Sequence, residues 1–216
     1  MLVGKPRPTV PRPPYFAPLE SSLRTLYQLA PADHAGAVTV LHLGAEDSTV
    51  LAGSGREPAG AWRLALGTRK TAREFFRAAL PSALEMETAI AAVEDEVLRL
   101  ADLPAGSRLV TGDTAMRRIA ALAGVPRGER MVLSLDAMEA LFQRLAAVIE
   151  GRPAAHENLP ASAGFAAALL ILREFMHHQR FATITVLVAA GDDDQSASGG
   201  AGWGDSPEPA PSAPIR

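Results

Sequence analysis

The sequence predicts one α/β domain built on a mixed β-sheet. Three short β-like runs with brief links stand near the start of the chain, and such neighbours favour an antiparallel meander. Further along, helical patterns alternate with two more β-like runs, which favours parallel pairing. The chain has 216 residues, of which 48% are hydrophobic, enough to fill the core of one ordinary domain.

The composition excludes several classes of protein. The formal net charge is −3, so there is no electrostatic case for nucleic acid or an anionic membrane as partner. Cysteine is absent, which excludes disulfides, thiol chemistry and cysteine metal sites. The N-terminal residues are proline-rich and lack the apolar core of a signal peptide. The most apolar segment, 164–176, is too short to span a bilayer. We expect a soluble, cytoplasmic protein.

The first part of the chain is an arm followed by a helix and three strands. Residues 1–18 are rich in proline and predict an extended or disordered arm. Leucines at helical spacing predict an amphipathic helix over 19–29. Apolar runs separated by glycine-containing turns predict strands over 37–43, 48–52 and 61–66.

Helices dominate the rest of the chain. Ser82, with Glu85 three residues later, has the pattern of a capping box, and Ser134 is a second candidate N-cap. After residue 190 the composition becomes low-complexity, which predicts a disordered tail over 191–216. The expected elements are a brief helix over 71–77, a helix over 83–101, a strand over 107–110, helices over 115–123, 135–150 and 162–179, a loop over 153–160, and a strand over 181–189.

The turn between the first two strands is the most informative stretch. Strand, small-residue turn, strand is how several phosphate-binding hairpins begin, because backbone N–H groups can converge on an anion there. Here the turn carries Glu46 and Asp47, which would repel a phosphate. The following pair Arg69-Lys70 is either solvated or an anion contact, with the solvated reading favoured.

The order of elements and several spaced segments carry a resemblance to a known family. Residues 40–50 stand where that family has a strand followed by Asp-Ile-Gly-Gly-Gly-Ser-Thr-Glu. Residues 61–67 and 71–76 resemble its Ser-Leu-Pro-Leu-Gly and Thr-Glu-Arg-Phe segments, and residues 103–114 resemble a strand leading to a Gly-Gly-Thr turn. Residues 19–188 thus resemble the second domain of the exopolyphosphatase / guanosine pentaphosphate phosphohydrolase (Ppx/GppA) family. That domain is ribonuclease-H-like and belongs to the actin/hexokinase/Hsp70 (ASKHA) superfamily.

The chain departs from the family at the positions of the second phosphate loop. His42 replaces the Asp, Asp47 replaces the Ser and Thr49 replaces the closing Glu, while Gly44-Ala45-Glu46 stands for Gly-Gly-Gly. We expect His42 to be a polar residue of a strand with its hydrogen bonds made inside the protein, rather than a base.

Other family features are also altered. The Gly-Gly-Thr turn becomes Gly112-Asp113-Thr114, and serines stand where the family has the glutamates of Gly-x-Glu-Glu-Ala-Arg, with Glu20 one position off. The family's first domain is expected to be missing, because only the proline-rich arm precedes residue 19. Hydrolysis of phosphoanhydrides needs a base, a metal held by carboxylates and donors for the phosphates, and each is lost or altered here.

The resemblance therefore implies a degenerate domain, a pseudoenzyme that acts by binding. We expect no catalytic residue, no cofactor, and a homo-oligomer or protein partner that covers the cleft face. The expected ligand-binding residues are Gly44, Asp47, Ser48, Gly112 and Thr114.

Two alternatives stay open. One is a metal-dependent hydrolase of polyphosphate or guanosine pentaphosphate, with Mg²⁺ held by Glu46, Asp47 and Asp113 if the two turns face each other. The other is a scaffold whose proline-rich arm and tail recruit partners.

Overall fold

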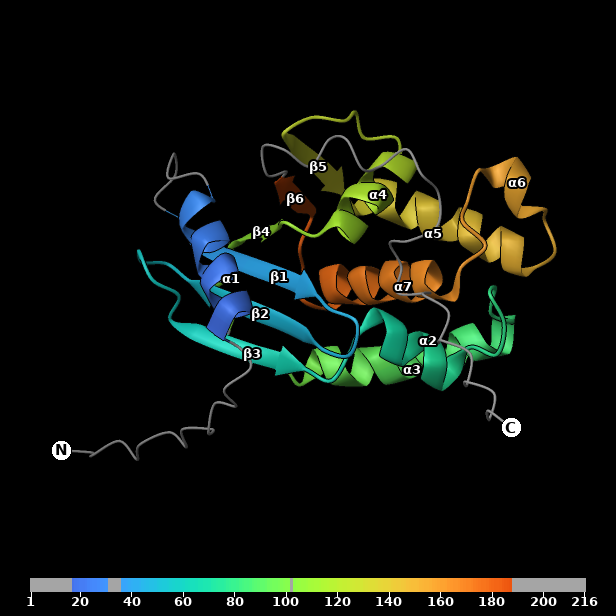
Figure 1. Ribbon diagram of the computed structural model, residues 1–216, viewed down its shortest axis with the longest axis horizontal. Helices are drawn as coiled ribbons and strands as arrows, with labels where there is room; N and C mark the ends of the chain where they lie inside the picture. The colour runs from blue at the N-terminus through green and yellow to red at the C-terminus, as the bar shows by residue number, and fades with distance from the viewer. Residues whose placement is uncertain (1–16, 31–35, 102, 188–216) are drawn as a thin grey trace, which may run out of the picture.

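The computed structural model describes residues 17–30, 36–101 and 103–187, and within them the predicted α/β architecture with a mixed sheet is confirmed. Six strands form one sheet in the order β3-β2-β1-β4-β6-β5 (Figure 1). Most of the predicted arm and tail lies outside the described residues, so the division into 1–18, 19–190 and 191–216 stays a prediction.

The predicted meander is present, and the later strands join it in parallel. β1 (Val38–Leu43), β2 (Ser48–Gly53) and β3 (Gly60–Leu64) are antiparallel neighbours. β4 (Arg108–Thr111) pairs with β1, and β6 (Thr183–Leu187) pairs with β4, both in parallel. The carboxyl ends of β1, β4 and β6 therefore lie side by side at the same end of the sheet.

One strand and one short helix escaped the sequence analysis. β5 (Arg130–Ser134) pairs antiparallel with β6 and forms an edge of the sheet. Its side chains alternate between buried and exposed, with Met131 and Leu133 buried and Val132 exposed. The strand is short, however, and a helix follows it directly. The predicted loop 153–160 contains the one-turn helix α6 (Ala154–Glu157).

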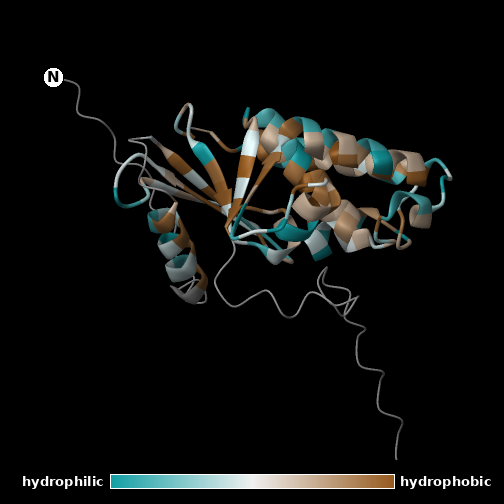
Figure 2. Ribbon diagram, turned by 90° about the horizontal axis from the view of Figure 1, so that it is seen from above, coloured by the Kyte–Doolittle hydropathy of each residue, from teal (hydrophilic) through white to brown (hydrophobic). Residues whose placement is uncertain are grey.

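The two faces of the sheet are covered unequally. Figure 2 shows α1 (Ala17–Leu29) on one side of the sheet and the other long helices on the opposite side. Leu23 and Tyr27 of α1 pack on Val40 and Leu51, making a small second core. The main core lies on the other face. The helices on that side are α2 (Thr68–Phe75), α3 (Ala83–Leu98), α4 (Thr114–Leu122), α5 (Leu135–Ile149) and α7 (Ala163–His178).

The predicted central helix is confirmed as α7. Twelve of its residues are buried, and it packs against α2, α3, α4 and α5. Its N-cap Ser162 accepts a hydrogen bond from the Phe165 amide. The capping box of α3 is also present, since the Ser82 hydroxyl accepts from the Glu85 amide and the Glu85 carboxylate accepts from the Ser82 amide. Within the described residues, no helix combines the length and apolarity needed to cross a membrane.

Candidate functional site

The candidate site lies where β1 and β4 end. In open α/β sheets, ligands bind beyond the carboxyl ends of the parallel strands. Here these ends lead into the two turns singled out by sequence, 44–47 after β1 and 112–114 after β4. The two turns are neighbours, because the Leu43 amide donates a hydrogen bond to Asp113 Oδ2 over 2.7 Å.

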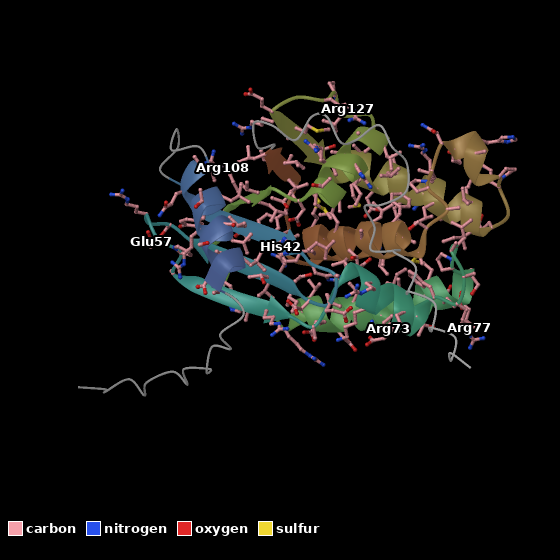
Figure 3. The ribbon with its side chains drawn as sticks, viewed as in Figure 1. His42, Glu57, Arg73, Arg77, Arg108 and Arg127 are labelled. Carbon is pink, nitrogen blue, oxygen red and sulfur yellow. The ribbon has the colours of Figure 1, made fainter. Side chains whose placement is uncertain are left out.

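A histidine and an aspartate join the two turns. His42 Nδ1, near the end of β1, donates to Asp113 Oδ1 at 2.7 Å (Figure 3 labels His42 at this place). Asp113 occupies the N-cap position of α4, but its side chain makes no capping bond there. Its carboxylate instead serves β1 through His42 and the Leu43 amide, so Asp113 fixes the spacing between the turns.

The charge state of His42 depends on this pairing. The side chain is 25% exposed. Burial of the ring acts to lower the pKa of His42, but the hydrogen bond that the ring donates to Asp113 and the charges of Asp113 and Asp47 outweigh it, so the pKa is raised. The expectation that His42 is a satisfied polar residue agrees with this contact. The pairing itself was missed, because 71 residues separate the partners.

The turn 44–47 is held by hydrogen bonds from the first residues of α2. The amides of Thr68 and Arg69 donate to the carbonyls of Gly44 and Ala45, each at 2.9 Å. These bonds satisfy N-terminal amides of α2 and explain why the helix begins three residues earlier than predicted. The first amides of α2 are therefore used within the protein.

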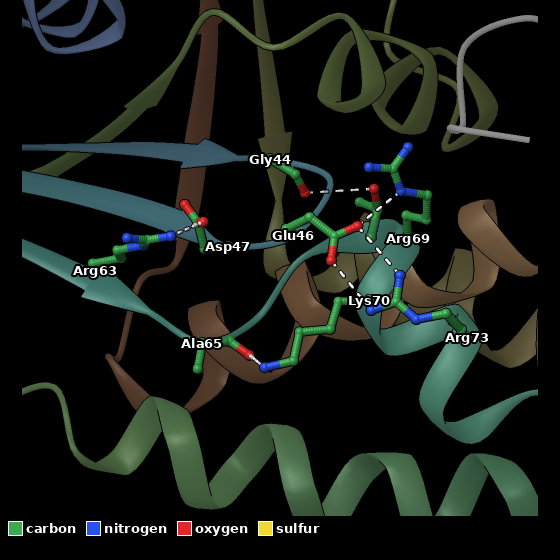
Figure 4. A network of polar contacts seen from close by, with 9 residues as sticks. Gly44, Glu46, Asp47, Arg63, Ala65, Arg69, Lys70 and Arg73 are labelled. Atoms are coloured by element: carbon green, nitrogen blue, oxygen red, sulfur yellow. Dashed lines mark hydrogen bonds and ion pairs between the residues drawn. The ribbon is translucent and has the colours of Figure 1, made fainter. Parts of the chain in front are cut away.

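The two carboxylates of this turn are paired with arginines. Glu46 bonds Arg69 at 2.8 Å and Arg73 at 3.2 Å, and Asp47 bonds Arg63 (Figure 4). Hydrogen bonds from Arg73 and Arg69 lower the pKa of Glu46. From the sequence, the negative charges of Glu46 and Asp47 were expected to repel a phosphate. In the structure each carboxylate is paired with a guanidinium, which offsets that repulsion.

The basic pair after Gly67 is also engaged. Arg69 reaches Glu46, and Lys70 Nζ donates to the carbonyl of Ala65 at 2.8 Å (Figure 4). Neither side chain is simply solvated, as the favoured sequence reading had it. Glu20, the displaced substitute for the family's glutamates, forms a 3.0 Å ion pair with Arg24 on the same helix.

The predicted ligand-binding residues divide into two groups. Gly44, Asp47, Gly112 and Thr114 lie on the two turns, with Gly112 and Thr114 exposed. Ser48 is different, since it is fully buried and its hydroxyl donates to the Leu66 carbonyl at 2.6 Å. Ser48 thus faces the interior, unlike the other four residues, and its role in ligand binding stays a prediction.

The three carboxylates proposed for a metal have separate partners. Glu46 pairs with arginines of α2, Asp47 with an arginine of β3, and Asp113 with His42. Among the residues that the structure describes, no three His, Asp or Glu side chains gather where they could hold a metal ion. The predicted Glu46–Asp47–Asp113 cluster is therefore not formed in this structure, although the turns do lie side by side.

A second charged cluster lies inside the helical layer and was missed by sequence. The Glu174 side chain on α7 is 3% exposed and receives bonds from Arg173 and His178. Arg173 also bonds Glu139 of α5 and stacks over the Phe142 ring. The sequence does show the charged pair Arg173-Glu174 within a strongly apolar helix. It does not show which residues pair with them.

The chain is similar in fold to solved structures of Ppx/GppA proteins. The chain superposes on the Ppx/GppA enzyme of Aquifex aeolicus with a TM-score of 0.62 at 16% identity, over 79% of this chain and 59% of that one. An exopolyphosphatase-like protein gives a TM-score of 0.54 at 16% identity, over 78% of this chain and 62% of that one. An exopolyphosphatase from Cytophaga hutchinsonii gives 0.52 at 12%, over 76% and 57%.

These likenesses show the fold. The chain has the Ppx/GppA-like, ribonuclease-H-like architecture that the sequence predicted, and it spans about three fifths of the length of the structures it matches. No protein-family model and no curated protein sequence matches the chain.

Proposed function

We propose that this chain is a non-hydrolytic relative of the Ppx/GppA phosphatases that acts by binding, as a regulatory module in the cytoplasm. The observation that carries this proposal is the pairing of the three carboxylates on the two turns. Glu46, Asp47 and Asp113 are each paired with a basic group of the same chain. A carboxylate engaged in this way is poorly placed to hold a catalytic metal or to activate water.

The ligand-contacting surface in this proposal is the pair of turns at the sheet edge. Gly112 and Thr114 are exposed there, and Thr114 offers a hydroxyl. Gly44 lets the first turn close on the Asp47 carbonyl oxygen, which a Cβ would meet at 2.5 Å. Domains of the superfamily that this fold resembles normally pack against a sister domain. We therefore propose that a second copy or another protein covers this edge. Light scattering of the purified chain tests this, and a monomer at all concentrations would argue against the second copy.

The hydrolase alternative makes an opposite prediction, so one assay separates the two. Phosphate release from polyphosphate and from guanosine pentaphosphate is measured with excess Mg²⁺ and with EDTA. We expect no release above a protein-free blank under either condition. The matched variants are Asp47→Ala, in the turn, and Asp95→Ala, exposed on α3.

Release that needs Mg²⁺ and is lost in Asp47→Ala but kept in Asp95→Ala would mean that the turns still build a metal site. The proposed non-hydrolytic function would then be wrong. Release that survives in both variants, or without Mg²⁺, would indicate a contaminating phosphatase, which a second purification of each variant would expose.

A further inference from the structure

Part of the sheet has no helix over it on the side of α1. Figure 2 shows that α1 alone, among the described helices, lies on that side. Within the described residues, the small core under α1 extends across the sheet as far as Val110 of β4 and Leu187 of β6. β5 is the next strand and lies beyond this core. The α1 side of β5 is therefore an uncovered sheet face.

The strand register shows which side chains lie on this face. Val132 of β5 lies opposite Thr185 of β6, and Thr185 lies opposite Val110 of β4. Residues in such register project from the same face of the sheet, so Val132 faces the α1 side. Its side chain is 46% exposed, so an apolar group on this face is left in contact with water. Arg130, two residues earlier on β5, projects from the same face beside Leu187.

Two arginines at the start of β5 have side chains without a partner. Arg127 (Figure 3) precedes the strand and Arg130 begins it, and both are exposed. Within the described residues, neither guanidinium makes a hydrogen bond or an ion pair. The exposed Glu129 lies between them in the sequence. From α4 through β5, residues 114–134 contain four arginines and one acidic residue, so this part of the molecule is basic.

The chain leaves β6 at the same place. β5 runs antiparallel to β6, so Arg130 at the start of β5 lies opposite Leu187 at the end of β6. The C-terminal segment, residues 188–216, lies outside the described residues, and its sequence contains five acidic residues and one arginine. Because the whole chain has a formal net charge of −3, the C-terminal segment is negative and residues 1–187 are positive. The two parts therefore carry opposite charges.

The C-terminal segment has groups that match those of the uncovered face, and they lie within reach. Its acidic residues begin with the run 192–194, and Asp192 follows Leu187 by five residues. Five extended residues span about 17 Å, whereas neighbouring strands are about 4.8 Å apart. The segment also contains one aromatic residue, Trp203, between two glycines. An indole supplies a large apolar surface, which the exposed Val132 lacks as a neighbour.

We propose that the C-terminal segment docks on the uncovered face of β5 in the same chain, with the run 192–194 against Arg127 and Arg130 and with Trp203 against Val132. The segment is the occupant because it begins beside this face and carries the opposite charge. A single exposed ion pair contributes little. A flexible tether, however, holds the segment at an effective concentration in the millimolar range, where several weak contacts together are sufficient. This inference goes beyond the proposed function and does not rest on it.

Trp203 itself reports on this contact. The other tryptophan of the chain, Trp62, lies on β3, and the substitution Trp62→Phe leaves Trp203 as the one indole. Acrylamide quenching of the fluorescence of this chain is compared with that of a synthetic peptide of residues 188–216. We expect a quenching constant several-fold lower in the chain than in the peptide, because docking shields the indole. We also expect emission at a shorter wavelength, because the indole leaves water.

The charged and the apolar contacts are tested separately. Arg127→Gln and Arg130→Gln, made together, should raise the quenching constant towards that of the peptide, and so should about 1 M NaCl, where the Debye length is about 3 Å. Val132→Thr keeps the β-branched shape, removes apolar surface and should also raise it. Arg56→Gln is the matched control and should change nothing. Arg56 is another exposed arginine without a side-chain partner in the described residues, and it lies in the β2–β3 connection at the opposite end of β1.

Circular dichroism checks the fold of every variant. If Trp62→Phe does not fold, the signal of Trp203 is the difference between the unchanged chain and Trp203→Phe. Quenching as strong as in the peptide would overturn the docking, and so would protection that persists in the arginine and valine variants. Protection that is lost on dilution would assign the covering segment to a second copy and overturn the contact within one chain. Phosphate release would overturn the proposed function and leave this result unchanged.

Discussion

Gly67 lies so close to Ala45 that a Cβ on the glycine would come within 2.4 Å of the Ala45 carbonyl oxygen. The contact is with backbone, which cannot swing away as a side-chain tip can. It joins the start of α2 to the β1–β2 turn, alongside the two amide–carbonyl bonds described above. The position therefore demands glycine for space, since its φ of −147° is accessible to any residue.

Replacing Gly67 by alanine should destabilise the fold by about 1–3 kcal/mol, the usual cost of overpacking. The measurement is the free energy of unfolding in urea. Gly128→Ala is the control, because the nearest atom to its added Cβ, the Arg130 carbonyl oxygen, stands at an ordinary 3.9 Å. Equal stabilities for the two variants would contradict the close packing of α2 on the turn.

Removing the carboxylate of Asp113 should cost about 1–3 kcal/mol, because the Leu43 amide and the His42 ring lose their acceptor. Asp113→Asn keeps one acceptor oxygen and should lose less than Asp113→Ala. Urea unfolding at pH 7 gives the order of the three proteins. If the two variants prove equally stable, the two-pronged contact with β1 is not what Asp113 contributes.

The stability of the protein should depend on pH through His42. Its pKa is raised in the folded state, where the hydrogen bond and charge of Asp113 outweigh burial. The contribution is therefore fully present below the unfolded pKa of about 6.5 and is lost as the pH rises through the folded pKa. The stability difference between wild type and His42→Asn should shrink from pH 5.5 to pH 8.5. A difference that stays constant or grows would show that the ring is not held as an imidazolium by Asp113.

Breaking the buried cluster on α7 should cost more than any surface change. Glu174→Ala leaves Arg173 and His178 without their shared partner inside the helical layer, and losses near 3 kcal/mol are typical of a broken buried pair (about 3–5 kcal/mol). The control is Glu87→Ala on the exposed side of α3, which should change stability by less than about 0.5 kcal/mol. Thermal melting of both variants is sufficient, and similar melting temperatures would contradict the role of Glu174.

Local patterns predicted most of the fold. The capping box at Ser82, the glycine-marked turns and the apolar face of α7 each depend on residues within a few positions of one another, and all are present. β5 was missed because a five-residue strand with two buried side chains is a weak signal beside the helix that begins at Leu135. The sequence predicted that the first three strands form a meander and that later strands pair in parallel. It did not predict the order of the later strands in the sheet.

The two turns of the candidate site were singled out from sequence, but their interactions were not. Sequence singled out both turns but left open whether they face each other. It could not tell that Glu46 meets Arg69 or that Asp113 meets His42, because those contacts depend on the packing of α2 and on the register of β4 against β1. The inward rotation of Ser48 follows from its pairing with Leu64 at the start of β2, which no spacing rule encodes.

The position of β6 has a consequence for how the chain folds during synthesis. β5 pairs only with β6 among the described strands, and β6 lies between β4 and β5 although it follows both of them in the chain. Ribosomes add about 5–20 residues per second, so β4 and β5 wait, each with an open edge, until α7 and Leu187 have emerged. Until then, these open edges are available for pairing with another nascent chain on the same polysome, and slower synthesis of α7 and β6 prolongs that exposure.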